Sequence, residues 1–353
     1  MSISPHLDNN FNLLRLVAAS SVIFSHAYDV TSGLHDPLSA GIGYPVGWVA
    51  VSAFFSMSGY LIYKSALRTP SAADYMTARC LRILPGLWAM LIITTLALSS
   101  ISVLSLADYL GTSETWEYFF GNAIIYTPRY ELPGVFLGNP LAGVVNGSLW
   151  TLRFEFTCYI LVIALSVSGV FSRERWFRLF AVAAVAGYLA FIAHALLTNT
   201  TQSALFDGNS AAKFHRLCFA FLLGMLFARY RDGMSVSWSM ILGVYLAAAV
   251  LWQTTLFQPA LIAAIAVTCF KIAFAPMPAL DWAKTMPDVS YGMYIYAFPV
   301  QQVFAYAFPQ WSPLQNSLAS LPATLLPAIL SWYLVEKPAL RLKGKFIFTR
   351  AGA

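Results

Sequence analysis

Residues 84–104 read LPGLWAMLIITTLALSSISVL and contain no charged side chain. A transmembrane helix needs ~20 predominantly apolar residues, so this stretch is long enough to cross a bilayer. Similar apolar runs recur along the chain, and the expected spans are residues 11–30, 47–67, 84–104, 148–171, 176–197, 214–230, 238–257, 260–276, 288–308 and 317–336. The pattern predicts an all-α fold, a polytopic transmembrane helix bundle of about ten spanning helices. We expect one membrane-embedded domain over residues 1–353, with no separate soluble domain.

The composition of the chain is typical of a membrane protein. Of its 353 residues, 59% are hydrophobic and 10% are charged, whereas an ordinary soluble domain carries about 25% charged residues. This excludes a soluble globular enzyme and a disordered protein. A β-barrel is not expected, because its strands alternate apolar and polar residues and lack long apolar runs. The cysteines have no CxxC spacing, so we expect neither a disulfide framework nor a metal site.

The basic residues are distributed unevenly between the two sides of the expected bundle. With a cytoplasmic N-terminus, the cytoplasmic segments contain Lys64, Arg68, Arg79, Arg82, Arg173, Arg175, Arg178, Arg229, Arg231, Lys284, Lys337, Arg341, Lys343, Lys345 and Arg350. The opposite side contains only Arg129 and Lys213. By the positive-inside rule, this asymmetry predicts that both termini are cytoplasmic. The net charge of +6 then reflects orientation among membrane lipids, and we expect no nucleic-acid partner.

Two polar side chains interrupt the first expected span. Arg15 and His26 are eleven residues apart, which at ~100° per residue places them on one helical face, ~16 Å apart along the axis. Charged groups within a bilayer normally face a protected interior and have a function. A histidine exchanges protons near neutral pH, so His26 is a candidate general base. The alternative is a core histidine that only packs and bonds a carbonyl.

The connection after the second expected span reads RCLRILPGLW and contains Arg79 and Arg82. The two arginines are three residues apart and therefore share one side of a helix. Two guanidinium groups at the inner membrane surface can clamp phosphates. Arginines at this position also serve topology and lipid headgroups, and spacing alone does not separate these roles.

The fourth expected span opens with SLWTLRFEF, which contains Arg153 and Glu155. Being two residues apart on a helix, they point to different faces, so each is expected to meet a partner from another span. Glu155 is a candidate partner for Arg15 or Arg216. It is also a candidate to orient His26. The alternative is a buried ion pair that only fixes helix packing.

Small residues mark the second expected span, which contains FFSMSGYLIYKS. Ser58 and Gly59 permit a close backbone approach or a break in the helix. Tyr60 adds a hydroxyl group. Small residues in membrane helices usually serve packing, so this motif alone is a weak indication of function.

Taken in order, these motifs resemble the acyltransferase-3 family of integral membrane acyltransferases. FNLLRLVAASSVIFSHAY contains the family's Arg-x10-His pair, and FFSMSGYLIY, RCLRILPGLW and SLWTLRFEFTCY resemble its next three elements. FHRLCFAFLLGMLFA, SYGMYIYAFPV and SWYLVEKPALRL resemble three later elements. The resemblance covers nearly the whole chain. One departure is Ala297, which stands where the family's SYxxYLxHxP element often carries a histidine.

The resemblance implies transfer of an acyl group, usually acetyl, to a hydroxyl. The expected donor is acetyl-CoA or another acyl-CoA as a co-substrate, with no metal. Acceptors in the family are mostly sugars of cell-surface or exported glycans, so the expected partner is a glycan or lipid-linked sugar. The expected location is the bacterial cytoplasmic (inner) membrane. The alternative is a proton-coupled transporter or flippase of a glycolipid, which would also need buried charges.

The resemblance also implies roles for individual residues. His26 is the expected general base, and Arg79 and Arg82 are expected to hold the phosphates of acyl-CoA. Arg15 or another internal cation is expected to stabilise the oxyanion. Glu155 is expected to hold the imidazole or balance a buried arginine. Supporting positions are Ser58, Gly59, Tyr60, Trp150, Arg153, Arg216, Tyr291, Tyr294 and Glu336.

Overall fold

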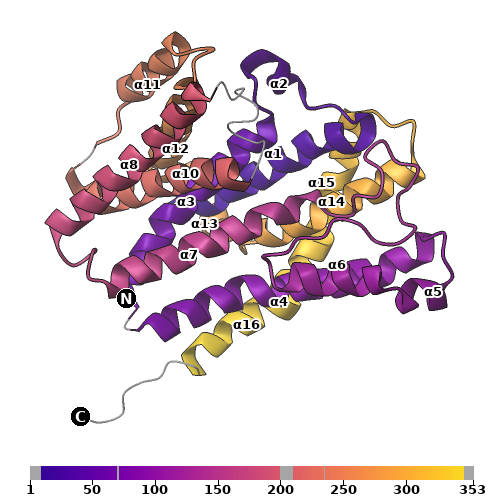
Figure 1. The fold of residues 1–353 in the computed structure, drawn as a ribbon. Coiled ribbons are helices and arrows are strands. Elements are labelled where there is room, and N and C mark those ends of the chain that lie inside the picture. Colours follow the sequence, from indigo (N-terminus) through magenta and orange to yellow (C-terminus); the bar gives the residue numbers. More distant parts are fainter. Residues whose placement is uncertain (1–8, 70, 199–209, 234, 346–353) are drawn as a thin grey trace. The chain divides into compact units, whose positions relative to one another are not determined.

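The computed structural model describes residues 9–69, 71–198, 210–233 and 235–345. Within these ranges the chain is helical (Figure 1), with no β-strand and one isolated bridge between Glu131 and Val144. The predicted all-α class is therefore confirmed. Among the charges that predict the orientation of the chain, Arg350 lies outside the described residues.

The helices follow the apolar runs of the sequence. They are α1 (Phe11–Ser32), α2 (Pro37–Ile42), α3 (Val46–Arg68), α4 (Ala72–Leu98), α5 (Leu106–Gly111), α6 (Ser113–Ala123), α7 (Leu152–Val167), α8 (Glu174–Leu197), α10 (Ser210–Tyr230), α11 (Trp238–Val250), α12 (Phe257–Ala273), α13 (Trp282–Thr285), α14 (Ser290–Ala307), α15 (Pro313–Ser331) and α16 (Lys337–Arg341). A 3₁₀ turn over Gly147–Thr151 precedes α7, and a π-helical turn over Trp332–Glu336 joins α15 to α16.

Within the described part of the chain, seven helices are long and apolar enough to cross a membrane. The bent pair Phe257–Ala273 and Pro278–Thr285, with 88° between its helices, gives an eighth if it forms one span. The polytopic character of the fold is thus supported, but the expected number of about ten spans is not confirmed. Helix α11 has only 13 residues because a turn ends it before residue 257. Helix α14 is not among the seven, since its tyrosines and glutamines lower its hydropathy.

The chain forms two compact units, each assembled from separate stretches of sequence. The first unit comprises Met1–Leu14, Val51–Met76 and Phe154–Lys284, and the second comprises Arg15–Ala50, Thr77–Arg153 and Thr285–Ala353. The expected site residues of the first unit are Ser58, Gly59, Tyr60, Glu155 and Arg216. Those of the second unit are Arg15, His26, Arg79, Arg82, Trp150, Arg153, Tyr291, Tyr294 and Glu336.

In the first unit, the small residues of α3 bring its backbone directly against α10. A Cβ atom added at Gly59 would overlap the backbone carbonyl of Phe221. One added at Gly224 would overlap the carbonyl oxygen of Ser56 and lie 2.7 Å from the backbone nitrogen of Tyr60. Backbone contact of this kind is typical of small residues between membrane helices. Because α3 is continuous, close packing rather than a helix break explains Gly59.

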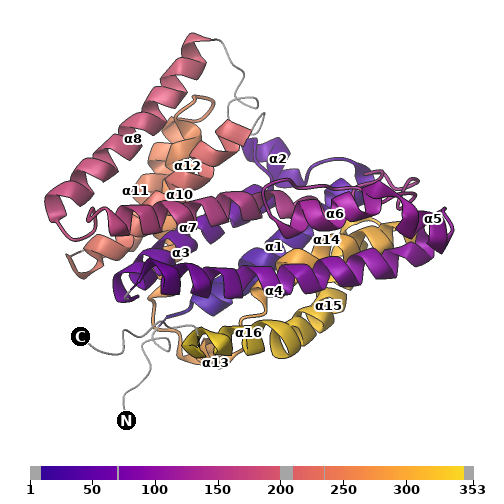
Figure 2. The ribbon, with the colours of Figure 1, turned by 60° about the horizontal axis from the view of Figure 1, so that its bottom comes forward.

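In the second unit, α14 packs along α15, as the two views in Figures 1 and 2 show. A Cβ atom at Gly292 would lie 2.8 Å from the Cα atom of Ala328. Further along, Asn316 Nδ2 donates a hydrogen bond to the carbonyl oxygen of Gln301 at 3.1 Å. The order of these contacts shows that the two helices are antiparallel.

Candidate active site

Helix α1 carries Arg15 and His26, and both residues meet the segment that contains α14. Arg15 Nη1 lies 2.9 Å from Oδ2 of Asp288, which stands just before α14. Ten residues later, the ring centroid of Phe298 lies 5.0 Å from that of His26. The two contacts follow one another in the same direction along both segments. Arg15 and His26 therefore share the face of α1 that is turned toward α14.

The imidazole of His26 lies against protein rather than on an outward face of α1. Its ring meets Phe298 edge to face, at an interplanar angle of 69°. One turn earlier on α1, the carbonyl oxygen of Ile23 accepts a hydrogen bond from Gln301 Nε2 at 2.6 Å. His26 Nδ1 is buried and has no hydrogen-bond partner among the described residues. At Nδ1 the structure thus lacks the carbonyl bond that a histidine of purely structural role would make.

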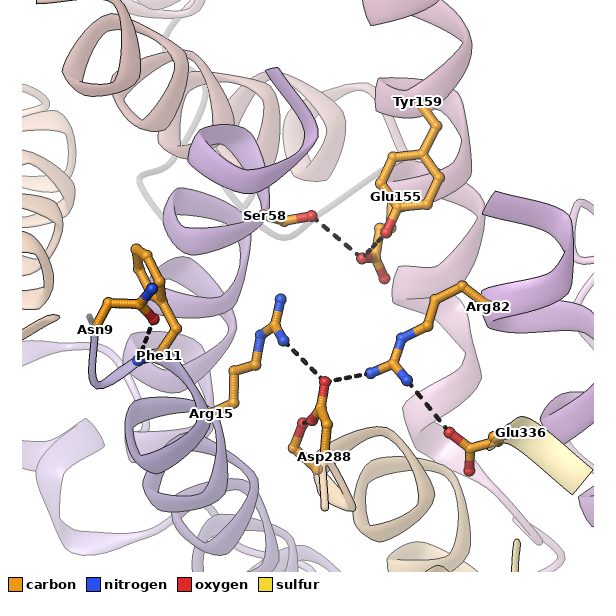
Figure 3. Close-up of polar contacts among 10 residues, drawn as sticks. Asn9, Phe11, Arg15, Ser58, Arg82, Glu155, Tyr159, Asp288 and Glu336 are labelled. Atoms are coloured by element: carbon orange, nitrogen blue, oxygen red, sulfur yellow. Dashed lines mark hydrogen bonds and ion pairs between the residues drawn. The ribbon is translucent and has the colours of Figure 1, made fainter. Parts of the chain in front are cut away.

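An ion network surrounds Asp288 in the second unit (Figure 3). Its Oδ2 atom is 2.9 Å from Arg15 Nη1 and 2.6 Å from Arg82 Nη2. Arg82 Nη1 is also 3.5 Å from Oε2 of Glu336, whose side chain is 1% exposed. The network therefore places two guanidinium groups and two carboxylates together, and their formal charges cancel. It connects α1, α4, the start of α14 and the π-helical turn before α16.

The electrostatics of Asp288 follow from its neighbours. Burial raises the pKa of this carboxyl group, but the charges of Arg82 and Arg15 and hydrogen bonds from Ser290 outweigh it and lower the pKa to about 2. Ser290 Oγ donates to Asp288 Oδ1 at 2.6 Å. A carboxylate shared by two guanidinium groups is a charge-assisted arrangement with fixed geometry. Asp288 is therefore ionised across the physiological pH range and fixes both arginine side chains.

Arg79 and Arg82 lie inside α4, so the prediction that they stand in the connection after the second span is wrong. The helix begins earlier because the Ser71 hydroxyl accepts a hydrogen bond from the backbone nitrogen of Asp74, at 3.1 Å, and caps the first turn. The guanidinium carbon of Arg82 lies 5.7 Å from the ring centroid of Trp332. Arg79, one turn earlier on the same helix, is half-buried.

The motif tyrosines of α14 tie this helix to its neighbours in the second unit. Tyr291 Oη donates to the carbonyl oxygen of Ile83 in α4 at 2.8 Å. Tyr294 Oη donates to the carbonyl oxygen of Ser148 in the 3₁₀ turn at 3.0 Å. Two further expected residues are half-buried in and just after this turn, Trp150 and Arg153. Both tyrosines thus position the elements around the α1–α14 contact.

In the first unit, Glu155 accepts hydrogen bonds from two hydroxyl groups (Figure 3). Ser58 Oγ of α3 donates at 3.3 Å, and Tyr159 Oη, one turn along α7, donates to the same oxygen. The backbone of Tyr159 also accepts a bond from Tyr75 Oη at 3.3 Å. The partner that Glu155 meets on another helix is thus a serine hydroxyl, and this contact holds α7 against α3.

Tyr60 and Arg216 are buried within the first unit. The Tyr60 ring packs against Phe11 and Phe274, with centroid distances of 5.3 and 5.5 Å. Its Oη accepts a hydrogen bond from Arg231 Nη1 at 3.2 Å. Arg216 lies in α10 with 2% of its surface exposed. A buried arginine in an apolar helix carries a large desolvation cost, which is consistent with a specific role.

Two acidic residues at this site were missed by the sequence analysis. Asp288 precedes the SYGMY motif, and the signal for it is that an arginine within an apolar span, such as Arg15, requires a counter-charge. Asp36 is 1% exposed and accepts hydrogen bonds from Ser25 Oγ at 2.5 Å and from the backbone nitrogen of Val46 at 2.8 Å. It therefore closes the connection between α1 and α3 beside the turn that carries the imidazole.

The chain is similar to one protein family and to two known proteins over nearly its whole length. A model of the acyltransferase-3 family, described as an acyltransferase domain, matches residues 8–336. The chain is 32% identical over 344 residues to the O-acetyl transferase of Shigella phage Sf6, covering 94% of this chain and 96% of the relative. It is 29% identical over 372 residues to nodulation protein 10 of Rhizobium leguminosarum bv. viciae, covering 97% and 96%. No solved structure matches the chain.

Proposed function

We propose, because this chain belongs to the acyltransferase-3 family, that it moves an acetyl group from acetyl-CoA to a hydroxyl of a cell-surface or exported glycan. The family makes the chain an acyltransferase, and its apolar helices make it an integral membrane protein. The similarity to a phage O-acetyl transferase over nearly the full length supports acetyl as the acyl group. The asymmetry of basic residues supports cytoplasmic termini in a bacterial inner membrane.

The observation that carries this proposal is the shared face of α1, with Arg15 at one end and His26 at the other. In the proposed reaction His26 takes the proton of the acceptor hydroxyl as its oxygen attacks the thioester carbonyl. The tetrahedral intermediate collapses, the C–S bond breaks, and the departing thiolate of CoA receives the proton from the imidazolium. General-base assistance of this kind typically contributes 10²–10⁴-fold in rate.

The positions of the arginine side chains give them different roles in this proposal. Arg15 is held by Asp288 and is ~16 Å from His26 along α1, too far to stabilise an oxyanion formed beside the imidazole. We therefore assign Arg15 to the donor end of the site, where Arg79 and Arg82 would bind the phosphates of acyl-CoA. Arg153, another internal cation of the second unit, is the candidate for the oxyanion. A donor well placed for that charge is worth roughly 3–4 kcal/mol.

Glu155 takes a different role in this proposal from the one expected. Its carboxylate receives hydroxyl hydrogen bonds from Ser58 and Tyr159. Through them it would fix α3 against α7 in the first unit, and the imidazole would be oriented by a residue of the second unit.

The test uses the full-length protein. Purified protein in lipid nanodiscs is mixed with acetyl-CoA and with surface glycan extracted from the bacterium that produces the protein. The release of CoA thiol and the formation of base-labile acetyl ester are measured in the same sample. We expect equal amounts of both products. His26→Ala should lower both by roughly 10²–10⁴-fold and leave acetyl-CoA affinity unchanged. The matched control is His194→Ala, which changes an exposed histidine of α8 and should leave both rates intact.

Two outcomes would contradict the proposal. A transporter or flippase would move glycolipid without releasing CoA thiol, so wild-type protein that forms neither thiol nor ester is not an acetyltransferase. Near-normal acetylation by His26→Ala would exclude the general-base role and leave the family activity in place.

A further inference from the structure

The contact between α1 and α14 contains two buried polar atoms that stand out. Among the described residues, His26 Nδ1 and Gln301 Oε1 have no hydrogen-bond partner. Gln301 is completely buried, with 0% of its surface exposed. Buried polar atoms in proteins are almost always paired, so each such exception calls for an explanation.

The orientation of the Gln301 amide is fixed by its other end. Its nitrogen, Nε2, lies 2.6 Å from the carbonyl oxygen of Ile23. A carbonyl oxygen only accepts hydrogen bonds, so the amide nitrogen must face it and Oε1 must face away. The amide oxygen is therefore an acceptor without a partner among the described residues.

Both unused atoms belong to residues on adjoining turns of the α1–α14 contact. Backbone carbonyls in an α-helix point toward the C-terminus, so the oxygen of Ile23 points to the turn that carries His26. On α14, side chains tilt toward the N-terminus, so Gln301 reaches back to the turn that carries Phe298. Phe298 is the residue whose ring contacts His26. His26 and Gln301 are thus linked through their near neighbours, Ile23 on α1 and Phe298 on α14.

We propose that Gln301 is a positioning residue for His26, and that its Oε1 accepts a hydrogen bond from Nδ1–H of the imidazole. This bond would hold the neutral ring in the tautomer whose Nε2 carries no proton. Nε2 is then the atom that takes the proton of the acceptor hydroxyl, a step that rests on the proposed function. Catalytic hydrogen bonds are often long in the substrate-free state and tighten when substrate binds.

The neighbouring glutamine provides a contrast within the same helix. Gln302 is equally buried, but its amide is fully used. Its Nε2 donates to the carbonyl oxygens of Leu141 and Val144 at 3.0 and 2.6 Å, and its Oε1 accepts from Asn139 Nδ2 at 2.7 Å. Gln302 thus has a structural role, and burial in α14 does not by itself leave an amide oxygen unpaired.

The direct test is the tautomer of His26 in the full-length protein. Protein with ¹⁵N-labelled histidine rings is studied in lipid bilayers by solid-state NMR at about pH 8, where a free imidazole is neutral. The signals of His26 are assigned by their loss in His26→Gln. In the wild type we expect the proton on Nδ1. Methionine has a similar shape to glutamine but no acceptor oxygen. In Gln301→Met we therefore expect fewer than half of the His26 rings to carry the proton on Nδ1. Gln301→Glu in its protonated form, which can donate to the Ile23 carbonyl and keeps an acceptor oxygen, should restore the Nδ1–H tautomer.

Activity gives the second readout. Gln301→Met should lower kcat for acetyl transfer roughly 10- to 100-fold, the effect of misplacing a reacting group, while acetyl-CoA affinity is retained. The control Gln302→Met should lower the yield of folded protein and leave the tautomer of the folded fraction unchanged.

The inference is overturned if wild-type His26 carries its proton on Nε2, or if Gln301→Met leaves the tautomer unchanged. Both results are independent of activity. Wild-type protein that shows the Nδ1–H tautomer but releases no CoA thiol would instead overturn the proposed function and leave the pairing of Gln301 with His26 intact.

Discussion

The guanidinium group of Arg15 and the carboxylate of Asp288 lie 2.9 Å apart and join the first turns of α1 to the segment that enters α14. The same carboxylate oxygen is 2.6 Å from Arg82 of α4. At the other end of the α1–α14 contact, His26 meets Phe298. One face of α1 therefore has an ionic end and an imidazole end, separated by ~16 Å.

Asp288→Asn should destabilise the protein strongly. The amide has no charge to balance Arg15 and Arg82. Because the three side chains are 15–24% exposed, the cost should lie below the ~3–5 kcal/mol that breaking a fully buried ion pair typically costs. Thermal unfolding in detergent measures this effect. The control is Asp281→Asn, because the Asp281 side chain is 57% exposed and its ion pair is local, with Lys284 three residues further along the chain. Its effect should stay within about 0.5 kcal/mol. Equal unfolding temperatures for the two variants would show that Asp288 is not a structural counter-charge.

Asp288 also predicts how stability depends on pH. Its pKa in the folded protein is about 2, compared with an ordinary value of 3.8. A carboxylate with a lowered pKa stabilises the folded state fully above its unfolded pKa, and this contribution is lost as the pH falls through the folded pKa. The unfolding temperature should therefore fall between about pH 4 and about pH 2. In Asp288→Asn the unfolding temperature should fall less over this pH range than in the wild type. An equal fall in both proteins would show that other carboxylates cause it.

Local sequence patterns predicted the helical class and the shared face of Arg15 and His26, because both depend on apolar runs and helical spacing within one segment. The ion network was not predictable in this way. Asp288 is far from Arg15 in sequence, and only the packing of α1 against α14 brings them together. The expected number of spans was not confirmed for a related reason, since apolar composition does not reveal the turn that ends α11 before residue 257.

Arg79 and Arg82 should respond differently to replacement by alanine. Loss of a charge-assisted bond to a phosphate corresponds to about 1.5–3 kcal/mol, so Arg79→Ala should weaken acetyl-CoA binding by roughly 10- to 100-fold. Arg82→Ala should also lower the unfolding temperature, because it leaves the buried carboxylate of Glu336 without its ion pair. Calorimetric binding and thermal unfolding measured on the same preparations separate the two effects. Unchanged donor affinity in Arg79→Ala would remove this residue from the donor site.

The close contact of α3 with α10 leaves no room for a side chain at Gly224. Gly224→Ala places a methyl group against the carbonyl oxygen of Ser56 and 2.7 Å from the backbone nitrogen of Tyr60. Neither backbone atom can move without displacing a helix, so we expect a loss of about 1–3 kcal/mol, as for overpacking of a core. The matched control is Gly243→Ala in α11, where an added Cβ atom meets nothing within 4 Å. That change removes a flexible glycine from a helix and should leave the unfolding temperature equal or slightly higher. If Gly224→Ala were as stable as its control, α3 and α10 could not be packed backbone to backbone, and Gly59 would need another explanation.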